Sequence, residues 1–189
     1  MKTITINELC ENIYSGGTPQ SGNKEYYDGD IPFLSITDIK NKYVSSTQKH
    51  ITQAAIENSS SKIIKTDTVC MTIYATIGVP FILKKNIAIP QSILAFELKK
   101  DIDSEFFYYY LLSMNNEFER ISTVGTQPNL SKKDITKIQL HIPNNIKQIK
   151  IGSFFIILLN SLGDIVDWLS KNGYQSKLLG IIILYTDYI

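Results

Sequence analysis

The stretch TDTVCMTIYATIGVPFILKKNIAIPQSILAFEL, residues 66–98, carries the clearest strand pattern in the chain. β-Branched residues stand at both even and odd positions of its first part, which is typical of a strand covered on both faces. Gly78, Pro80 and Pro90, with a turn at Lys85 and Asn86, divide the stretch into short apolar runs. Short runs joined by tight turns predict several short, mostly antiparallel strands.

A helix is predicted directly after these strands. Asp103 is a suitable N-cap, and apolar residues then recur at the spacing of one helical face as far as Ile121. These residues are Phe106, Phe107, Tyr110, Leu111, Met114, Phe118 and Ile121. An aromatic stripe at this spacing is typical of core packing, and we assign it to the core rather than to base stacking.

Weaker patterns flank this centre. Residues 3–13 predict a brief amphipathic helix with Asn7 as a possible cap, and residues 52–61 predict a short helix capped by Thr52. A turn at residues 28–30 leads into a strand, and residues 138–142 alternate as a half-buried strand. The predicted fold class is therefore α/β (α+β): a mixed, mostly antiparallel twisted sheet with flanking helices.

The region from Ile146 to Leu169 predicts a helix that is apolar on nearly every side. Its own domain can cover only one of these sides, so we predict a two-fold dimer through this helix. The predicted interface residues are Ile151, Phe154, Phe155, Leu158, Leu162, Ile165 and Leu169. The pattern of residues 170–189 fits a strand and a helix equally well.

Composition restricts the class of protein. The 189 residues are 43% hydrophobic and 20% charged, which is typical of a folded domain, and the formal net charge is +1. The N-terminus lacks the pattern of a secretory signal, and two cysteines make no disulfide framework. The apolar runs are shorter than the roughly 20 residues of a membrane span. We expect a cytoplasmic protein that does not contact a membrane.

Catalytic, metal and cofactor motifs are missing from the sequence. His50 and His141 lie far apart, and neither has a cysteine or carboxylate at metal-ligand spacing. The chain lacks a phosphate-binding glycine loop, a nucleophile elbow and an Asn-Pro-Pro-Tyr type element for methylation. We therefore expect neither an enzyme nor a bound cofactor or metal.

The sequence offers instead several loops rich in hydroxyls, amides and lysines. Hydroxyls and backbone amides commonly contact phosphate, and Asn or Gln can pair with adenine edges. A lysine cluster with a single acidic residue comes directly after the last of these loops. It comprises Lys132, Lys133, Lys137, Lys147 and Lys150. Ordinary turn chemistry and a solvated lysine face would explain the same residues.

Five segments in order resemble one family. They are GGTP (16–19) with EYYDGDIPFLSITDI (25–39) after it, then TIGVPFI (76–82), IAIPQSILAFEL (87–98), GTQPNLSKKDITKIQLHIP (125–143) and QIKIGSFF (148–155). Together they are similar to one half of the DNA specificity subunit of type I restriction-modification enzymes. The resemblance covers roughly residues 9–155. Residues 154–170 are nearly uncharged, unlike the long charged spacer helices of that family.

The resemblance implies a target recognition domain at residues 1–144 and a helical spacer or dimerisation segment at residues 145–189. It implies binding to double-stranded DNA, and to the modification subunit and through it the restriction subunit. Such a half-length chain would read one part of a split target as a homodimer. The alternative is an orphan or truncated half-subunit that binds the modification subunit without reading DNA.

The loops that the resemblance places on DNA supply the candidate contacts. The predicted DNA-facing residues are Thr18, Lys24, Tyr26, Tyr27, Thr72, Tyr74, Thr76, Gln91, Thr126, Gln127, Asn129, Lys132 and Lys133. The two lysines are expected on phosphates, and Gln91 and Gln127 on base edges.

Overall fold

The structure is a computed structural model that describes residues 2–122 and 129–161, the last four of them by their backbone alone. The elements in chain order are β1 (Lys2–Thr5), α1 (Ile6–Leu9), β2 (Cys10–Ser15), η1 (Lys24–Tyr26), β3 (Tyr27–Phe33), η2 (Ile36–Asp38), β4 (Tyr43–Val44), β5 (Lys49–Ile51), α2 (Gln53–Glu57), β6 (Lys62–Ile64), β7 (Val69–Thr72), β8 (Pro80–Leu83), β9 (Ile87–Ile89), β10 (Ile93–Leu98), α3 (Ser104–Ser113), α4 (Asn115–Ile121), α5 (Lys132–Lys137), β11 (Gln139–Ile142) and α6 (Asn145–Ser161).

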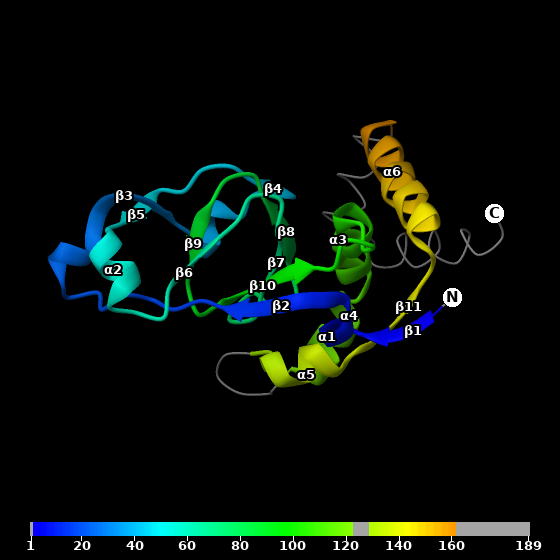
Figure 1. Cartoon of the computed structure of the whole chain (residues 1–189), viewed down its shortest axis with the longest axis horizontal. Coiled ribbons are helices and arrows are strands. Elements are labelled where there is room, and N and C mark those ends of the chain that lie inside the picture. Colours follow the sequence, from blue (N-terminus) through cyan, green and yellow to red (C-terminus); the bar gives the residue numbers. More distant parts are fainter. Residues whose placement is uncertain (1, 123–128, 162–189) are drawn as a thin grey trace.

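The strands form three sheets where the sequence predicted one. The five-stranded sheet has the order β2-β10-β7-β8-β4, the four-stranded sheet the order β5-β3-β9-β6, and β1 pairs with β11. Most pairs are antiparallel, and β3–β9 and β4–β8 are parallel. The predicted class, mixed α/β with mostly antiparallel strands, is confirmed. Figure 1 shows the four-stranded sheet and α2 at one end, and α3, α6 and β1 at the other.

The predicted helix at residues 104–121 forms as two helices. Asp103 caps α3 through a 2.8 Å hydrogen bond from the Phe106 amide, as predicted. The chain then breaks at Met114, whose backbone separates α3 from α4. Phe107 is buried and meets Phe96 of β10 edge to face, with ring centroids 5.4 Å apart. The aromatic stripe is therefore core, as predicted.

The N-terminal prediction is wrong in its extent. Thr5, rather than Asn7, caps α1, and it forms a capping box with Glu8. The helix ends after four residues, and Cys10–Ser15 continues as the edge strand β2. Long-range pairing with β10 overrides the short helical pattern there.

The start of α6 is attached to α3 by a buried amide and a glycine. Gln148 is 2% exposed; its side chain accepts a 2.9 Å hydrogen bond from the Asp103 amide and donates to the Pro143 carbonyl. A Cβ at Gly152 would lie 3.0 Å from the Glu105 side chain, so the glycine permits close packing of the two helices. The first half of α6 is thus held firmly on its own domain.

Phe155 and Phe154 point to opposite environments. Phe155 is 1% exposed and stacks on Tyr109 of α3 at 4.7 Å between ring centroids, whereas Phe154 is 47% exposed. The assignment of Phe155 to a dimer interface is wrong, because its own domain covers it. Ile151 is half-buried against the same core. The Leu158 side chain and residues Leu162, Ile165 and Leu169 lie outside the described part.

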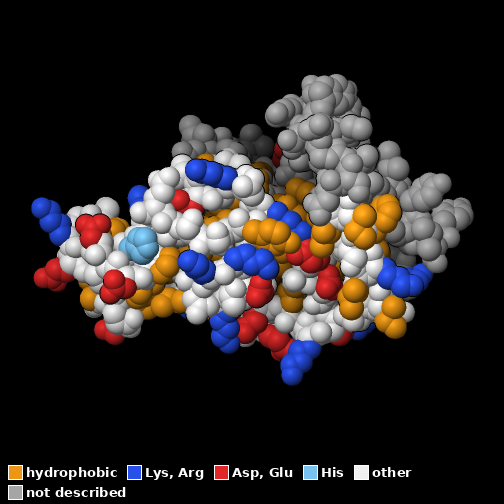
Figure 2. Space-filling model, turned by 90° about the horizontal axis from the view of Figure 1, so that it is seen from above, with side chains coloured by type: hydrophobic (Ala, Val, Ile, Leu, Met, Phe, Trp, Pro, Cys, Tyr) orange, Lys and Arg blue, Asp and Glu red, His pale blue; other side chains and the backbone are white. Residues whose placement is uncertain are grey.

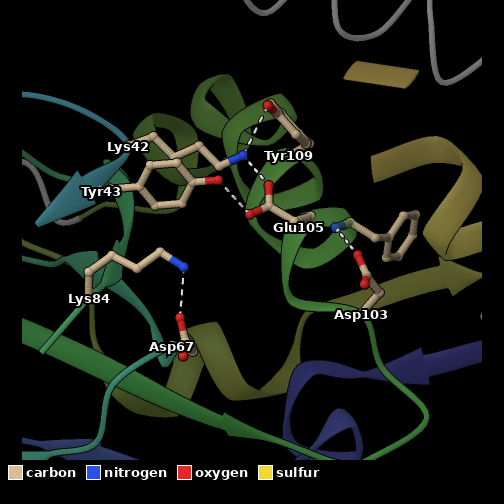
Figure 3. Close-up of polar contacts among 8 residues, drawn as sticks. Lys42, Tyr43, Asp67, Lys84, Asp103, Glu105 and Tyr109 are labelled. Atoms are coloured by element: carbon tan, nitrogen blue, oxygen red, sulfur yellow. Dashed lines mark hydrogen bonds and ion pairs between the residues drawn. The ribbon is translucent and has the colours of Figure 1, made fainter. Parts of the chain in front are cut away.

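A polar cluster fastens β4 to α3 (Figure 3). Lys42 forms an ion pair with Glu105 and donates a 3.0 Å hydrogen bond to the Tyr109 hydroxyl, with its ammonium 4.3 Å from the centroid of that ring. Burial lowers the pKa of Lys42, and Glu105 partly opposes that shift. Burial raises the pKa of Tyr108 to about 12 and also raises that of Tyr109. The partners that the structure shows for this cluster lie within the domain, so it is a structural link.

In the described residues, no helix is long and apolar enough to cross a membrane.

Candidate nucleic-acid interface

The connection between β7 and β8, residues 73–79, is a closed loop. At its base the Thr72 amide donates to the Val79 carbonyl at 3.1 Å, and the Thr72 hydroxyl accepts from the Val79 amide at 3.1 Å. Thr72 is 1% exposed. Its assignment as a DNA-facing residue is therefore wrong, because its side chain is buried and its hydroxyl accepts the hydrogen bond that closes the loop. Tyr74 and Thr76 beyond it are exposed.

This loop lies beside two other predicted segments. The Ile73 amide donates to the Ser92 carbonyl at 2.8 Å, and the Leu130 amide donates to the Ile73 carbonyl at 2.9 Å. Tyr74 and Asn129 also form an isolated antiparallel bridge. Ile73 is buried, and its backbone amide and carbonyl link its own loop to the segments that carry Ser92 and Leu130. The exposed Gln91 and Tyr74 are the chain neighbours of Ser92 and Ile73, the two residues joined by this hydrogen bond.

The GGTP loop joins the same assembly from its other side. The Gly17 amide donates to the Ile89 carbonyl at 3.2 Å. A Cβ on Gly16 would lie 2.0 Å from the Ile89 oxygen, so only glycine allows this approach. Because Ile89 stands two residues before Gln91, the loop runs beside the turn that carries Gln91. Thr18 is exposed there.

Lys24, Tyr26 and Tyr27, which are predicted to face DNA, differ in how far they are buried. Tyr26 and Tyr27 are half-buried and pack against the small core beneath the four-stranded sheet. The Tyr27 hydroxyl also donates to the Pro19 carbonyl at 2.8 Å, which ties the GGTP loop to β3. Lys24 is exposed. The structure does not bring these residues against the loop at 73–79 by any hydrogen bond described.

The two neighbouring lysines of α5 differ in their surroundings. Lys132 donates its ammonium to the Ile13 carbonyl of β2, so its charge is directed back onto the domain. The side chain of Lys133 is exposed. The wider lysine cluster is divided, since Lys147 and Lys150 belong to α6. Thr126 and Gln127 lie outside the described residues.

Ala75 is the residue of this surface that sequence reasoning missed. It has a φ of 62°, a conformation that costs a non-glycine residue about 1 kcal/mol or more, and it is exposed. The sequence immediately around it carries no asparagine or glycine to mark that conformation. The strain is maintained by the hydrogen bonds at the loop base and by Gly78, whose φ is 74°.

The loops of this surface carry mostly uncharged and basic side chains. Residues 72–79, 90–92 and 129–133 include hydroxyls, amides, one tyrosine and two lysines, and the acidic residue beside them is Asp134, in the first turn of α5. The hydroxyls, amides and lysines can donate to phosphate and read base edges without repelling a polyanion. Elsewhere acidic and basic side chains are interspersed, as Figure 2 shows for one face. Among the described residues, no three candidate ligands converge on a possible metal position.

Comparison with known proteins gives a consistent result. Residues 1–166 match the family described as the type I restriction modification DNA specificity domain. The type I restriction enzyme MjaIX specificity subunit of Methanocaldococcus jannaschii is 28% identical over 184 residues, which are 95% of this chain and 41% of that protein. The HindI specificity subunit of Haemophilus influenzae is 28% identical over 151 residues, 76% of this chain and 33% of that protein.

A solved structure shares the fold. The HsdS subunit from Thermoanaerobacter tengcongensis aligns with a TM-score of 0.65 and 18% identity, over 98% of this chain and 43% of that one. The chain thus spans less than half the length of each of these relatives. The match of the family over most of its residues shows that the chain belongs to the type I restriction modification DNA specificity domain family.

Proposed function

We propose that this chain is a DNA-reading unit of a type I restriction-modification system and is itself not catalytic. The observation that carries the proposal is the convergence of three loops on the buried Ile73. Around that point stand exposed hydroxyl, amide and phenol groups. Loops on a rigid scaffold are the usual carriers of binding groups. The family supplies the ligand class, double-stranded DNA.

The proposed roles follow side-chain chemistry. Lys133, exposed at the first turn of α5, would neutralise a phosphate. Gln91 and Thr76 would meet base edges, and Tyr74 would fill space beside them. Thr18 and Lys24 would make outer contacts. Residues 1–144 would form the recognition domain, and residues 145–189 the spacer.

The exposed side of α6 is the proposed contact with a second copy. Ile146 and Ile157 are 68% and 64% exposed, and Ile149 and Phe154 of the same helix are also exposed. A surface this apolar is stabilised by a partner. The relatives are more than twice as long as the matched region, so a second copy would restore two recognition domains at fixed spacing. We propose that the modification subunit, and through it the restriction subunit, join this assembly in the cytoplasm.

Selection from a pool of random duplexes tests DNA reading. The wild-type chain should enrich one sequence, and its affinity should fall with salt at a slope that reports several released counterions. Gln91→Ala should change the enriched sequence, whereas Gln139→Ala, exposed on β11, is the control and should leave it unchanged. Affinity without any enriched sequence would refute DNA reading. Tight binding to the modification subunit alone would then favour an interaction module.

Light scattering tests the second copy. The wild-type chain should be a dimer at micromolar concentration, and Ile157→Glu should shift it to a monomer by placing a charge on the exposed side of α6. Lys137→Glu, at an exposed lysine at the end of α5 and outside α6, is the control. A monomeric wild-type chain would refute the dimer and leave the DNA proposal standing.

A further inference from the structure

Thr72 is the most deeply buried hydroxyl of the loop region described. It is 1% exposed and lies at the last position of β7, where the chain leaves the five-stranded sheet. A buried threonine often has only to satisfy its own hydroxyl, which a neighbouring carbonyl within the same element can do. Here the hydroxyl instead accepts a hydrogen bond from the opposite end of the loop, from the Val79 amide.

Three hydrogen bonds from one residue define the loop. Besides the hydroxyl contact, the Thr72 amide donates to the Val79 carbonyl at 3.1 Å, and the Thr72 carbonyl accepts from the Gly78 amide at 2.9 Å. Two of these bonds use only the backbone and would remain with any residue. The bond to the Val79 amide alone depends on the side chain, so the residue type at position 72 determines whether that donor is satisfied.

The loop also carries conformational strain that needs such support. Ala75 and Gly78 both have positive φ, at 62° and 74°. A Cβ on Gly78 would lie 2.9 Å from the Phe118 ring, so α4 limits the alternative paths of the chain on that side. Removal of the bond at the Val79 amide would let Ala75 relax toward ordinary backbone angles. Tyr74 and Thr76 on either side of it would then move.

We propose that Thr72 is a positioning residue for sequence discrimination: it fixes the loop at 73–79 without touching DNA. This inference rests on the proposed DNA-reading function. Because Thr72 carries no charge and is buried, its role is in base preference and not in phosphate binding. A change at Thr72 should therefore alter discrimination between sequences and leave the salt dependence of binding intact.

The test compares three variants of one side chain. Thr72→Val keeps the shape and removes the acceptor, Thr72→Ser keeps the acceptor, and Thr72→Cys retains only a weak one. Binding is measured for the enriched duplex and for the same duplex with single base changes, at several salt concentrations. Hydrogen exchange of the Val79 amide reports the bond directly.

The expected order of discrimination is Thr, Ser, then Cys and Val. In Thr72→Val, the ratio of the affinity for the enriched duplex to that for a singly changed duplex should fall about tenfold or more. A correct base contact contributes roughly that factor or above. Its salt slope should equal that of the wild type, and its Val79 amide should exchange faster. If Thr72→Val does not fold, the comparison between Ser and Cys decides in the same way.

Three results would overturn the inference, and they are distinguishable. If the wild-type chain discriminates between sequences and Thr72→Val or Thr72→Cys discriminates equally well, Thr72 has no positioning role and the proposed function stands. If the wild-type chain does not discriminate at all, the proposed function fails and the inference fails with it. A parallel loss of affinity for every duplex, with an altered salt slope, would also contradict the proposal.

Discussion

Replacement of Phe155 by alanine should destabilise the protein far more than replacement of its neighbour Phe154. Phe155 is 1% exposed, stacks on Tyr109 at 4.7 Å and joins the main core. Loss of a buried phenylalanine costs about 3–5 kcal/mol, because the cavity cannot fully collapse. Phe154 is 47% exposed, so its removal should cost about 1 kcal/mol in a single protomer.

Urea unfolding followed by circular dichroism measures both free energies. Thermal unfolding gives the corresponding change in Tm. A chain of this length shifts its Tm by about 2–4 °C per kcal/mol, so Phe155→Ala should lower Tm by about 6–20 °C. Phe154→Ala should shift it by only a few degrees and should weaken dimerisation. The two variants should also separate in light scattering, where only Phe154→Ala produces monomer without unfolding.

The refuting result is specific. If the two alanine variants differ by less than about 1 kcal/mol in free energy of unfolding, the burial of Phe155 against α3 does not exist in solution. If Phe154→Ala is the more destabilising variant, α6 is rotated relative to the domain. The proposed exposed side of the helix would then be wrong as well.

Three other perturbations have defined outcomes. Gln148→Leu should cost about 2–4 kcal/mol in urea unfolding, since it leaves the Asp103 amide and a carbonyl without partners, whereas Lys147→Leu at the exposed neighbour should cost little. Stability should fall as pH rises above 10.0, because the pKa of Tyr108 is raised to about 12: the folded state keeps a proton there that the unfolded state loses. Spectrophotometric titration should show this group ionising with unfolding. Lys133→Ala should weaken binding to every duplex and reduce the salt slope by about one, more than Lys132→Ala does, since Lys132 already donates to the domain.

Helices with strong local signals were predictable from the sequence. The Asp103 cap and the Thr52 cap are where the pattern placed them, because capping depends on the side chain and the next few amides only. The strand at residues 139–142 is also predictable from its alternation. The break at Met114 and the strand β2 were missed, because long-range packing and pairing decide both.

Burial within the site was less predictable than the set of loops. Tyr74, Gln91 and Asn129 lie in segments that the structure brings together, but a sequence gives no direction for a side chain at the end of a strand. The sequence pattern therefore predicts Thr72 on the surface, whereas its hydroxyl closes the loop at 73–79. The same limit applies to Phe154 and Phe155, since a helix apolar all round does not show which side its domain covers.

The firm attachment of α6 to α3 has a geometric consequence. Gln148, Gly152 and Phe155 fix the phase of the helix relative to the domain, so a residue inserted beyond Phe155 changes only the placement of the chain after it. One such insertion would turn the distal part of the helix by about 100° and advance it by about 1.5 Å. The length of the helix therefore sets two quantities at once: the distance of the following segment from the domain and its rotation about the helix axis.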